Sequence, residues 1–276
     1  MRPGCMLYSL GRAIREGTLT VPAALGLMRD SGAEAVDLDA GNIAAHPPDE
    51  IRTMVADAGL VVSSFIGGAD LAVPEGPDRR DAVDRIRGRL DAAAELGAPI
   101  ALLTTGRCME GQERSEARSN IVFALSEVLA HAASVGVIPT IEDFGAGGAP
   151  YQTGAECLEV CERTGPALKL TYDSGNMVMG DDDPVAFLEL VKSRVVHVHA
   201  KDWKEIDASE ERGLTSRSGR RYVGELVGRG VLNYPAIFQA LRAIEYRGFV
   251  SFEYEGDGDP IQAAREGIRF IRAAIA

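Results

Sequence analysis

The chain has 276 residues, of which 46% are apolar, and this is enough to build a substantial buried core. Its net charge of −12 argues against a nucleic-acid partner, and no apolar stretch approaches the ~18 residues of a membrane span. The four cysteines show no disulfide framework and the first residues lack a signal-peptide layout, so we expect a reduced, cytoplasmic protein.

Strand-like and helix-like segments alternate along the whole chain. Apolar runs typical of strands cover residues 5–10, 35–38, 60–66, 99–104, 137–142, 168–172, 195–199 and 249–253. Helical patterns cover residues 21–31, 49–58, 78–96, 113–135, 154–164, 184–191, 234–244 and 260–275. The strands are too apolar for burial on one face only, which indicates a parallel sheet covered by helices on both faces. Eight units of a strand followed by a helix predict an α/β fold, a single-domain (β/α)8 TIM barrel over residues 1–276. An open doubly wound sheet is the competing fold, but no Gly-x-Gly-x-x-Gly turn follows the first strand.

The connection after the seventh strand, residues 200–232, is long and has no strong apolar period. It is crowded with charge, and its basic residues are Lys201, Lys204, Arg212, Arg217, Arg220, Arg221 and Arg229. Loops of this length are typically lids, binding loops or disordered segments. Because this one leaves the mouth of the predicted barrel, we expect a lid or clamp, with an inert excursion as the alternative.

Acidic or imidazole residues stand at the ends of four successive predicted strands. They are Glu142, Asp173, His199 and Glu253. In a closed parallel barrel these strand ends converge on one mouth, where barrel enzymes place their chemistry. Three carboxylates and one imidazole would hold one divalent cation there, and this ligand set suits Mn²⁺ or Mg²⁺, with Co²⁺ and Zn²⁺ as alternatives. Each residue taken alone could instead be a strand-end side chain bonded to a loop amide.

The segments around these residues resemble the xylose isomerase-like TIM barrel superfamily, the sugar phosphate isomerase/epimerase group. Its members show a Glu closing the fifth strand, an Asp closing the sixth, a His-x-His-x-Lys-Asp segment at the seventh and a Glu closing the eighth. Here these read Ile141-Glu142-Asp143, Asp173-Ser-Gly-Asn176, His197-Val-His199-Ala-Lys201-Asp202 and Ser251-Phe-Glu253-Tyr-Glu255. The resemblance covers essentially the whole chain. It implies that Glu142, Asp173, His199 and Glu253 are the metal ligands, and that Glu142 and Glu253 double as general acid and base.

Residues next to the ligands have roles that the sequence leaves open. Lys201 is a catalytic candidate that would contact a substrate oxygen or shuttle a proton, or else form an ion pair with Asp202 or Glu255. His197 lies on the face of the ligand histidine, one layer deeper, so it would contact substrate or else pack or hydrogen-bond behind that ligand. Glu255 lies two residues after Glu253, so its side chain would point to the same face of the eighth strand. It is the alternative ligand if the register of that strand differs by two residues.

Three more residues are candidates for substrate binding. Trp203 would form an apolar wall of the site, or else pack the long loop. Asn176 can hydrogen-bond a hydroxyl group but cannot act as an acid or base. Arg212 is one of the loop cations that would suit an anionic substrate.

Three positions depart from known members of the group. Ketose 3-epimerases usually carry a His where this chain has Asn176 and a second Glu where it has Gly148. Dehydroshikimate dehydratases tend to carry a His where this chain has Phe144. Asn176 and Gly148 argue against a free-ketose 3-epimerase.

Together, these features predict a divalent-metal-dependent isomerase or epimerase of a small keto-sugar or sugar acid. It would abstract a proton next to a metal-bound carbonyl and form an enediolate. The alternative is a lyase, a dehydratase or decarboxylase, that acts on a cyclitol ketone or keto-acid through the same enolate. A third hypothesis is a non-catalytic barrel. We expect a small polyol or keto-sugar substrate that could be anionic, and no nucleic-acid or membrane partner. The sequence leaves open whether the chain forms a homo-oligomer.

Overall fold

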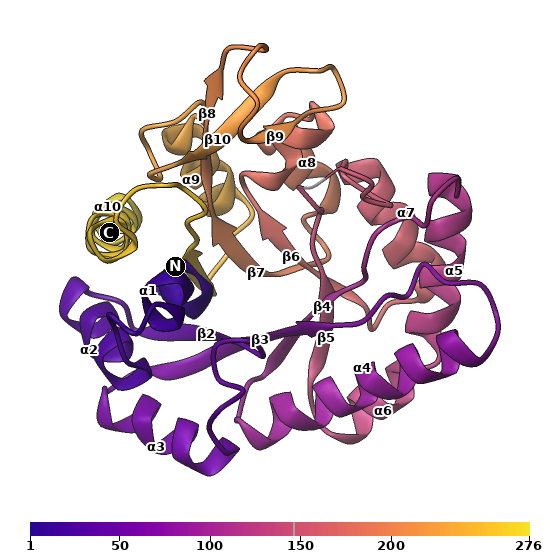
Figure 1. Ribbon diagram of the computed structural model, residues 1–276, viewed down its shortest axis with the longest axis horizontal. Helices are drawn as coiled ribbons and strands as arrows, with labels where there is room; N and C mark the ends of the chain where they lie inside the picture. The colour runs from indigo at the N-terminus through magenta and orange to yellow at the C-terminus, as the bar shows by residue number, and fades with distance from the viewer. Residues whose placement is uncertain (146) are drawn as a thin grey trace.

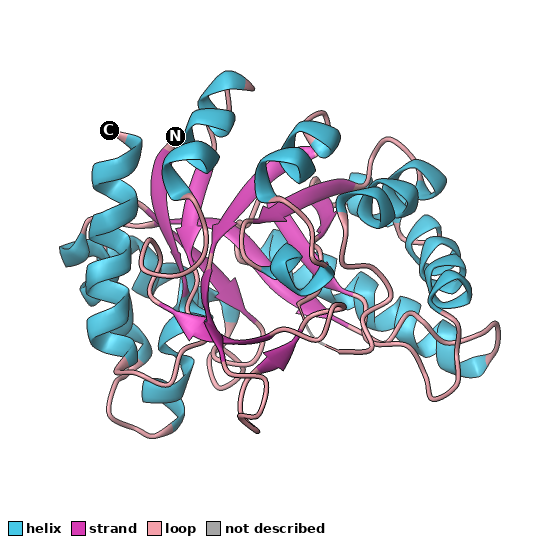
Figure 2. Ribbon diagram, turned by 90° about the horizontal axis from the view of Figure 1, so that it is seen from above, coloured by secondary structure: helices cyan, strands magenta, loops and turns pink. Residues whose placement is uncertain are grey.

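Eight parallel strands close into a barrel that helices surround (Figures 1 and 2). The computed structural model describes residues 1–145 and 147–276. The barrel strands are β1 (Arg2–Met6), β2 (Ala35–Asp39), β3 (Val61–Gly68), β4 (Ile100–Thr104), β5 (Ile138–Ile141), β6 (Lys169–Asp173), β7 (Val195–Ala200) and β11 (Phe249–Phe252). Their order around the barrel is β1-β11-β7-β6-β5-β4-β3-β2, so the predicted (β/α)8 fold is confirmed.

Most helices lie between successive strands and cover the outside of the barrel (Figure 1). They are α1 (Gly11–Arg15), α2 (Val21–Ser31), α3 (Pro48–Asp57), α4 (Pro77–Glu95), α5 (Arg114–Ser126), α6 (Leu129–Ser134), α7 (Gly154–Thr164), α8 (Pro184–Val191), α9 (Tyr234–Ala243) and α10 (Pro260–Ile275). Side-chain caps fix several starts: Thr153 forms a capping box with Glu156 at α7, and Asn233 and Asp259 cap α9 and α10.

Two predicted elements differ from the structure. The first strand ends at Met6, and the residues that follow form the 3₁₀ helix η1 (Leu7–Leu10). Leu7 and Leu10 are buried while Tyr8 is exposed, and this three-residue spacing fits a 3₁₀ turn better than a strand. The helix predicted over residues 113–135 is divided into α5 and α6, and no Gly or Pro marks the break between them.

The segment after β7 contains strands that the sequence analysis did not predict. β8 (Asp202–Ile206), β10 (Arg221–Glu225) and β9 (Leu214–Thr215) form an antiparallel sheet in the order β8-β10-β9, which stands at the top of Figure 1. Trp203 of β8 and Tyr222 of β10 are buried in a small apolar cluster with Val178 and Met179 of the 3₁₀ helix η2 (Asn176–Gly180). The many charged residues of this segment interrupt the apolar pattern of its strands, so the sequence alone did not predict them. We call residues 202–225 the β8–β10 insertion.

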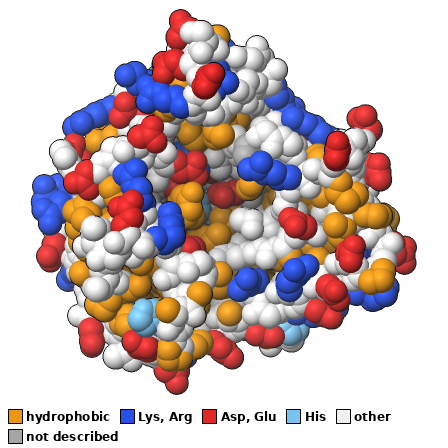
Figure 3. All heavy atoms as spheres, in the orientation of Figure 1, with side chains coloured by type: hydrophobic (Ala, Val, Ile, Leu, Met, Phe, Trp, Pro, Cys, Tyr) orange, Lys and Arg blue, Asp and Glu red, His pale blue; other side chains and the backbone are white. Residues whose placement is uncertain are grey.

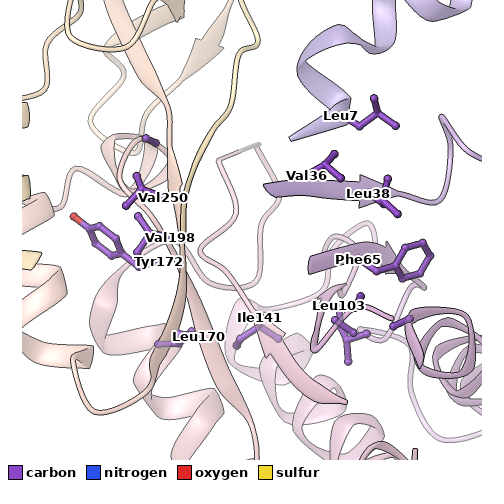
Figure 4. Close-up of a cluster of buried hydrophobic side chains, with 14 of the residues drawn as sticks. Leu7, Val36, Leu38, Phe65, Leu103, Ile141, Leu170, Tyr172, Val198 and Val250 are labelled. Carbon is purple, nitrogen blue, oxygen red and sulfur yellow. The ribbon is translucent and has the colours of Figure 1, made fainter. Parts of the chain in front are cut away.

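Alternation along the barrel strands separates an outer apolar face from a polar interior. Outer residues such as Val36, Leu103, Leu170 and Val250 belong to the main core between sheet and helices (Figure 4). Buried polar residues occupy the other face: Asp37, Thr140, Thr171, His197 and Ser251. β2 and β7 are not neighbours in the barrel, so the contact of 2.8 Å between Asp37 Oδ2 and His197 Nε2 crosses its interior. These polar groups support the mouth of the barrel from below.

Candidate metal centre and substrate cavity

The four strand-end residues meet at the carboxyl ends of the strands. Glu142 directly follows β5, Asp173 ends β6, His199 lies in β7, and Glu253 directly follows β11. Each contributes one possible ligand atom, and these atoms all lie within 4.8 Å of one another. Asp173 and His199 are fully buried, and Glu253 nearly so. The structure therefore brings together the whole predicted ligand set.

The polar atoms of this cluster suit a divalent cation. His199 Nδ1 lies 3.0 Å from Glu142 Oε2 and 3.3 Å from Glu253 Oε2, so this ring nitrogen faces the carboxylates. Among the described residues, Asp173 Oδ2 and Glu253 Oε2 are buried without a hydrogen-bond partner. Burial raises the pKa values of Glu142 and Asp173, because charged carboxylates are costly to remove from water. A bound cation would satisfy these oxygens and offset their mutual repulsion.

Asp37 supports His199 from the interior of the barrel. Its Oδ2 atom lies 3.2 Å from His199 Nε2 and 2.8 Å from His197 Nε2, and Ser63 donates a hydrogen bond to its Oδ1 atom. Burial alone would raise the pKa of Asp37, but the two imidazoles hold it well below its usual range. A carboxylate behind a ligand imidazole fixes the ring orientation and strengthens the ligand.

Of the two positions considered for His197, in contact with substrate or behind the ligand histidine, the structure shows the second. His197 lies behind His199, hydrogen-bonded to Asp37, and is not among the described residues that line the cavity at the mouth. Asp37 itself was missed by the sequence analysis. The signal was present, because Asp37 is a carboxylate in the middle of β2, between Val36 and Leu38, but its imidazole partners come from β7 on the far side of the barrel.

Lys201 is buried against the clustered carboxylates. Its Nζ atom lies 2.6 Å from Glu253 Oε1, 3.6 Å from Asp173 Oδ2 and 3.2 Å from Glu255 Oε1, and it donates a hydrogen bond to Asn176 Oδ1. Burial alone would lower the pKa of Lys201, but the surrounding carboxylates raise it. Of the two ion-pair partners considered from the sequence, the lysine thus contacts Glu255.

Asp202, the other partner considered, has a structural role instead. Its carboxylate accepts hydrogen bonds from the backbone N–H groups of Trp203, Gly228, Gly230 and Leu232. These bonds join the start of the β8–β10 insertion to the segment that follows it. The carboxylate therefore holds both ends of the insertion in place.

A cavity of about 520 Å³ opens at the mouth of the barrel, where Figure 3 shows a central hollow. Glu142, Glu253, Lys201 and Asn176 line it, whereas Asp173 and His199 do not. Glu255 also reaches the cavity. Apolar and aromatic side chains form much of the remaining wall: Met6, Tyr8, Ile66, Phe144 and Leu214. The cavity thus exposes two of the four clustered residues, and its wall is partly apolar.

Trp203 and Arg212, two expected substrate contacts, lie outside the lining of this cavity. The Trp203 ring is buried in the cluster beneath the β8–β10 insertion, and its Nε1 atom donates a hydrogen bond to the Gly175 carbonyl at 2.9 Å. Arg212 is exposed and pairs with Glu210 and Asp257. The structure places Trp203 in loop packing, the second role considered for it, and Arg212 in surface ion pairs.

Replacing Trp203 by alanine should lower the free energy of unfolding by about 3–5 kcal/mol, because a large buried ring and its hydrogen bond are lost. Urea unfolding followed by circular dichroism measures this change. Trp203→Phe keeps most of the ring volume and should lose clearly less. A loss below about 1 kcal/mol for Trp203→Ala would mean that the ring does not anchor the insertion.

The structure is a parallel barrel with a buried cluster of carboxylates and an imidazole at the carboxyl ends of its strands. In (β/α)8 barrel enzymes, the active site lies at this face of the barrel. The chain belongs to the xylose isomerase-like TIM barrel family, whose model matches residues 25–274. No helix in the described part of the chain is long and apolar enough to cross a membrane.

Curated relatives are similar over part of their length. Inosose dehydratase 2 from Bacillus cereus is 30% identical over 132 residues, which are 45% of this chain and 44% of that protein. Inosose dehydratase from Lacticaseibacillus casei is 26% identical over 135 residues, 46% of this chain and 45% of that protein. The matched part therefore spans less than half the length of these relatives.

Solved structures share the fold over almost the whole chain. L-ribulose 3-epimerase has a TM-score of 0.79 at 18% identity, covering 99% of this chain and 94% of that one. 3-keto-D-glucoside 4-epimerase from E. coli has a TM-score of 0.75 at 18% identity, covering 99% of both chains. A probable 3-DHS dehydratase from Bacillus anthracis has a TM-score of 0.77 at 16% identity, again covering 99% of both.

Proposed function

We propose that the protein is a divalent-metal-dependent isomerase or epimerase of a small keto-sugar or sugar acid. One observation carries this proposal: Glu142 and Glu253 belong to the four-residue cluster and also line the cavity. Two carboxylates that reach both the cation site and the substrate can transfer protons at a carbon next to a carbonyl group. Asp173 and His199, which lie behind the cavity lining, would act only as ligands.

The cation that fits the donor set is Mn²⁺, with Mg²⁺, Co²⁺ and Zn²⁺ as alternatives. Glu142, Asp173, His199 and Glu253 would hold it. When bound, it would supply positive charge that polarises the substrate carbonyl and stabilises the enediolate. Metal analysis of carefully purified protein tests its presence. Protein without a stoichiometric divalent metal would favour the third hypothesis, a non-catalytic barrel.

Asp37→Asn should weaken the binding of Mn²⁺ by about 10–100-fold, because His199 loses the carboxylate that orients its ring. Isothermal titration calorimetry measures the affinity. Ser63→Ala is the matched control, because it removes only the hydrogen bond to Asp37 Oδ1 and should have a smaller effect. An unchanged affinity in Asp37→Asn would show that this carboxylate does not support the metal ligand.

The residues around the cavity have distinct proposed tasks. Glu142 and Glu253 would remove and return a proton on opposite faces of the substrate carbon, which inverts that centre. Lys201, which contacts Glu253, Glu255 and Asn176, would exchange one of these partners for a substrate oxygen, and Asn176 would bind a hydroxyl group. The apolar part of the wall would help to exclude water from the reacting carbon.

A dehydratase is the second candidate, and the similarity to inosose dehydratases favours it. A dehydratase would begin with the same proton abstraction. One of the two glutamates would then protonate a departing hydroxyl group instead of returning the proton to carbon. The two glutamates on the cavity thus fit both outcomes, and the product distinguishes them.

The deciding experiment is NMR in deuterated water, with Mn²⁺ supplied for turnover and removed before the spectra are recorded. Keto-sugars, inosose and keto-acids would be tested as substrates. Deuterium in the recovered substrate, together with an isomer at constant mass balance, supports the isomerase or epimerase. An unsaturated or shortened product replaces it with the lyase. If neither exchange nor product appears with any of these compounds, the enolisation proposal fails for these substrate classes.

The β8–β10 insertion is the proposed lid or clamp of this site. Leu214 of β9 lines the cavity, so the insertion reaches its rim, while Trp203 and Asp202 anchor its base. Hydrogen exchange tests the proposal. Slower exchange of the amides in β9 when a substrate is bound supports a lid, and unchanged exchange in a saturated complex would contradict it.

A further inference from the structure

A second cavity, of about 880 Å³, adjoins the candidate site on the side of β3 and β4. The two cavities share Thr104, Arg107 and Phe144 in their walls. From this shared wall the second cavity continues outward between residues that follow β3 and residues that follow β4, over the side of α4. A substrate that fills the first cavity could therefore extend into the second without leaving the protein surface.

Three arginines line this second cavity, and each lacks an anionic partner. Arg85 and Arg89 come from α4, and Arg107 follows β4. Within residues 1–145 and 147–276, no ion pair or hydrogen-bond acceptor is found for any of them, and the Nε atom of Arg89 is buried without a partner. Asp70 is the single carboxylate among the described lining residues, and it forms no ion pair with them. The cavity wall thus carries an excess of unpaired positive charge.

The arginines of the β8–β10 insertion and its flank are different. Arg212 pairs with Glu210, Arg217 with Glu156, Arg220 with Asp181, and Arg229 with Glu266. The charges of these four arginines are compensated by neighbouring carboxylates. Arg221 of β10 has no ion pair in the described part of the chain, but it donates hydrogen bonds to Thr215 Oγ1 and the Arg212 carbonyl. The arginines of the second cavity have no such acceptors among the described residues, and they lie on the other side of the mouth.

Local structure places Arg89 across the end of β3 and Arg107 in the wall between the two cavities. Gly67 of β3 lines the first cavity, and a Cβ atom at this position would lie 2.9 Å from Arg89 Cδ. The glycine therefore leaves the space through which the Arg89 side chain crosses the end of β3. The Arg107 guanidinium lies 6.0 Å from the centroid of the Phe144 ring, in the wall between the cavities.

We propose that this second cavity binds an anionic group of the substrate, a phosphate ester or a carboxylate, whose reacting carbon lies in the first cavity. Guanidinium groups bind both anions through charge-assisted, bidentate hydrogen bonds. The inference rests on the proposed function for the position of the reacting carbon. The anion site itself stands on the arginines and can be tested without turnover.

The test is calorimetric titration of the full chain with inorganic phosphate and with malonate, each with and without Mg²⁺. Arg89→Gln and Arg107→Gln should each weaken the binding of the preferred anion by about tenfold or more. Gly67→Ala should weaken it too, because it displaces Arg89. Arg80→Gln is the matched control, since Arg80 is an exposed residue of α4 outside the cavity lining and its loss should change nothing. Thermal unfolding confirms that each variant is folded.

The outcomes distinguish a phosphate from a carboxylate as the bound group, and they test the anion site separately from the proposed function. Tighter binding of phosphate indicates a phosphorylated substrate, and tighter binding of malonate indicates a sugar acid. The anion site is refuted if neither probe binds, if binding survives both arginine changes with or without Mg²⁺, or if Arg80→Gln weakens it equally. Anion binding by a protein that exchanges no substrate proton would retain this site and overturn the proposed function instead.

Discussion

Glu142→Gln and Glu253→Gln should each lower kcat by about 10²–10⁴-fold, the contribution expected of a general acid or base. Glutamine keeps the size of the side chain and one oxygen that can face a cation, but it cannot accept the substrate proton. Both glutamates line the cavity, so the loss should appear in kcat rather than in KM alone. Steady-state kinetics with the substrate identified by NMR provides the measurement.

Asp173→Asn is the matched control for these changes. Asp173 belongs to the same cluster but is absent from the cavity lining, so it should act as a ligand and take no part in proton transfer. Its variant should bind Mn²⁺ more weakly and regain activity when Mn²⁺ is raised to saturation. The two glutamine variants should stay inactive at the same metal concentration. Near wild-type turnover in either one would remove that glutamate from the mechanism.

The sequence predicted the barrel and the meeting of the four strand-end residues because both depend on local patterns. Apolar runs that alternate with helical periods specify a (β/α)8 barrel, and the ends of parallel strands must meet at one face. Glu142 and Glu253 could therefore be placed together although 111 positions separate their numbers, 142 and 253. No side-chain contact had to be known for this step.

The surroundings of the cluster were harder to predict because they depend on contacts between distant segments. Asp37 reaches His199 only after β2 and β7 face each other across the closed barrel. Similarly, Arg217 and Arg89 look alike in the sequence. Only the folded chain places Glu156 beside Arg217 and leaves Arg89 without a carboxylate in ion-pair range among the described residues. Charge composition alone could not show which cations are free to bind a substrate.

Lys201→Met should lower the free energy of unfolding of the metal-free protein by about 3–5 kcal/mol, the range seen when one partner of a buried ion pair is removed. The lysine is buried and lies 2.6 Å from Glu253 and 3.6 Å from Asp173, so its loss leaves these carboxylates without their nearest cation. Urea unfolding in the presence of a chelator measures this loss. Lys192→Met is the matched control, because the exposed pair of Lys192 with Glu189 should contribute less than about 1 kcal/mol.

A divalent cation should reduce the cost of Lys201→Met, because its charge would partly replace that of the ammonium group beside the same oxygens. Binding to the native state alone stabilises a protein by RT ln(1 + [L]/Kd), about 2.7 kcal/mol at a hundredfold excess over Kd. Removing a competing positive charge should tighten metal binding, so the gain from Mn²⁺ should be larger in Lys201→Met than in the wild type. Equal gains in the two proteins would show that the lysine and the metal do not share these carboxylates, and would move the cation site away from Glu253.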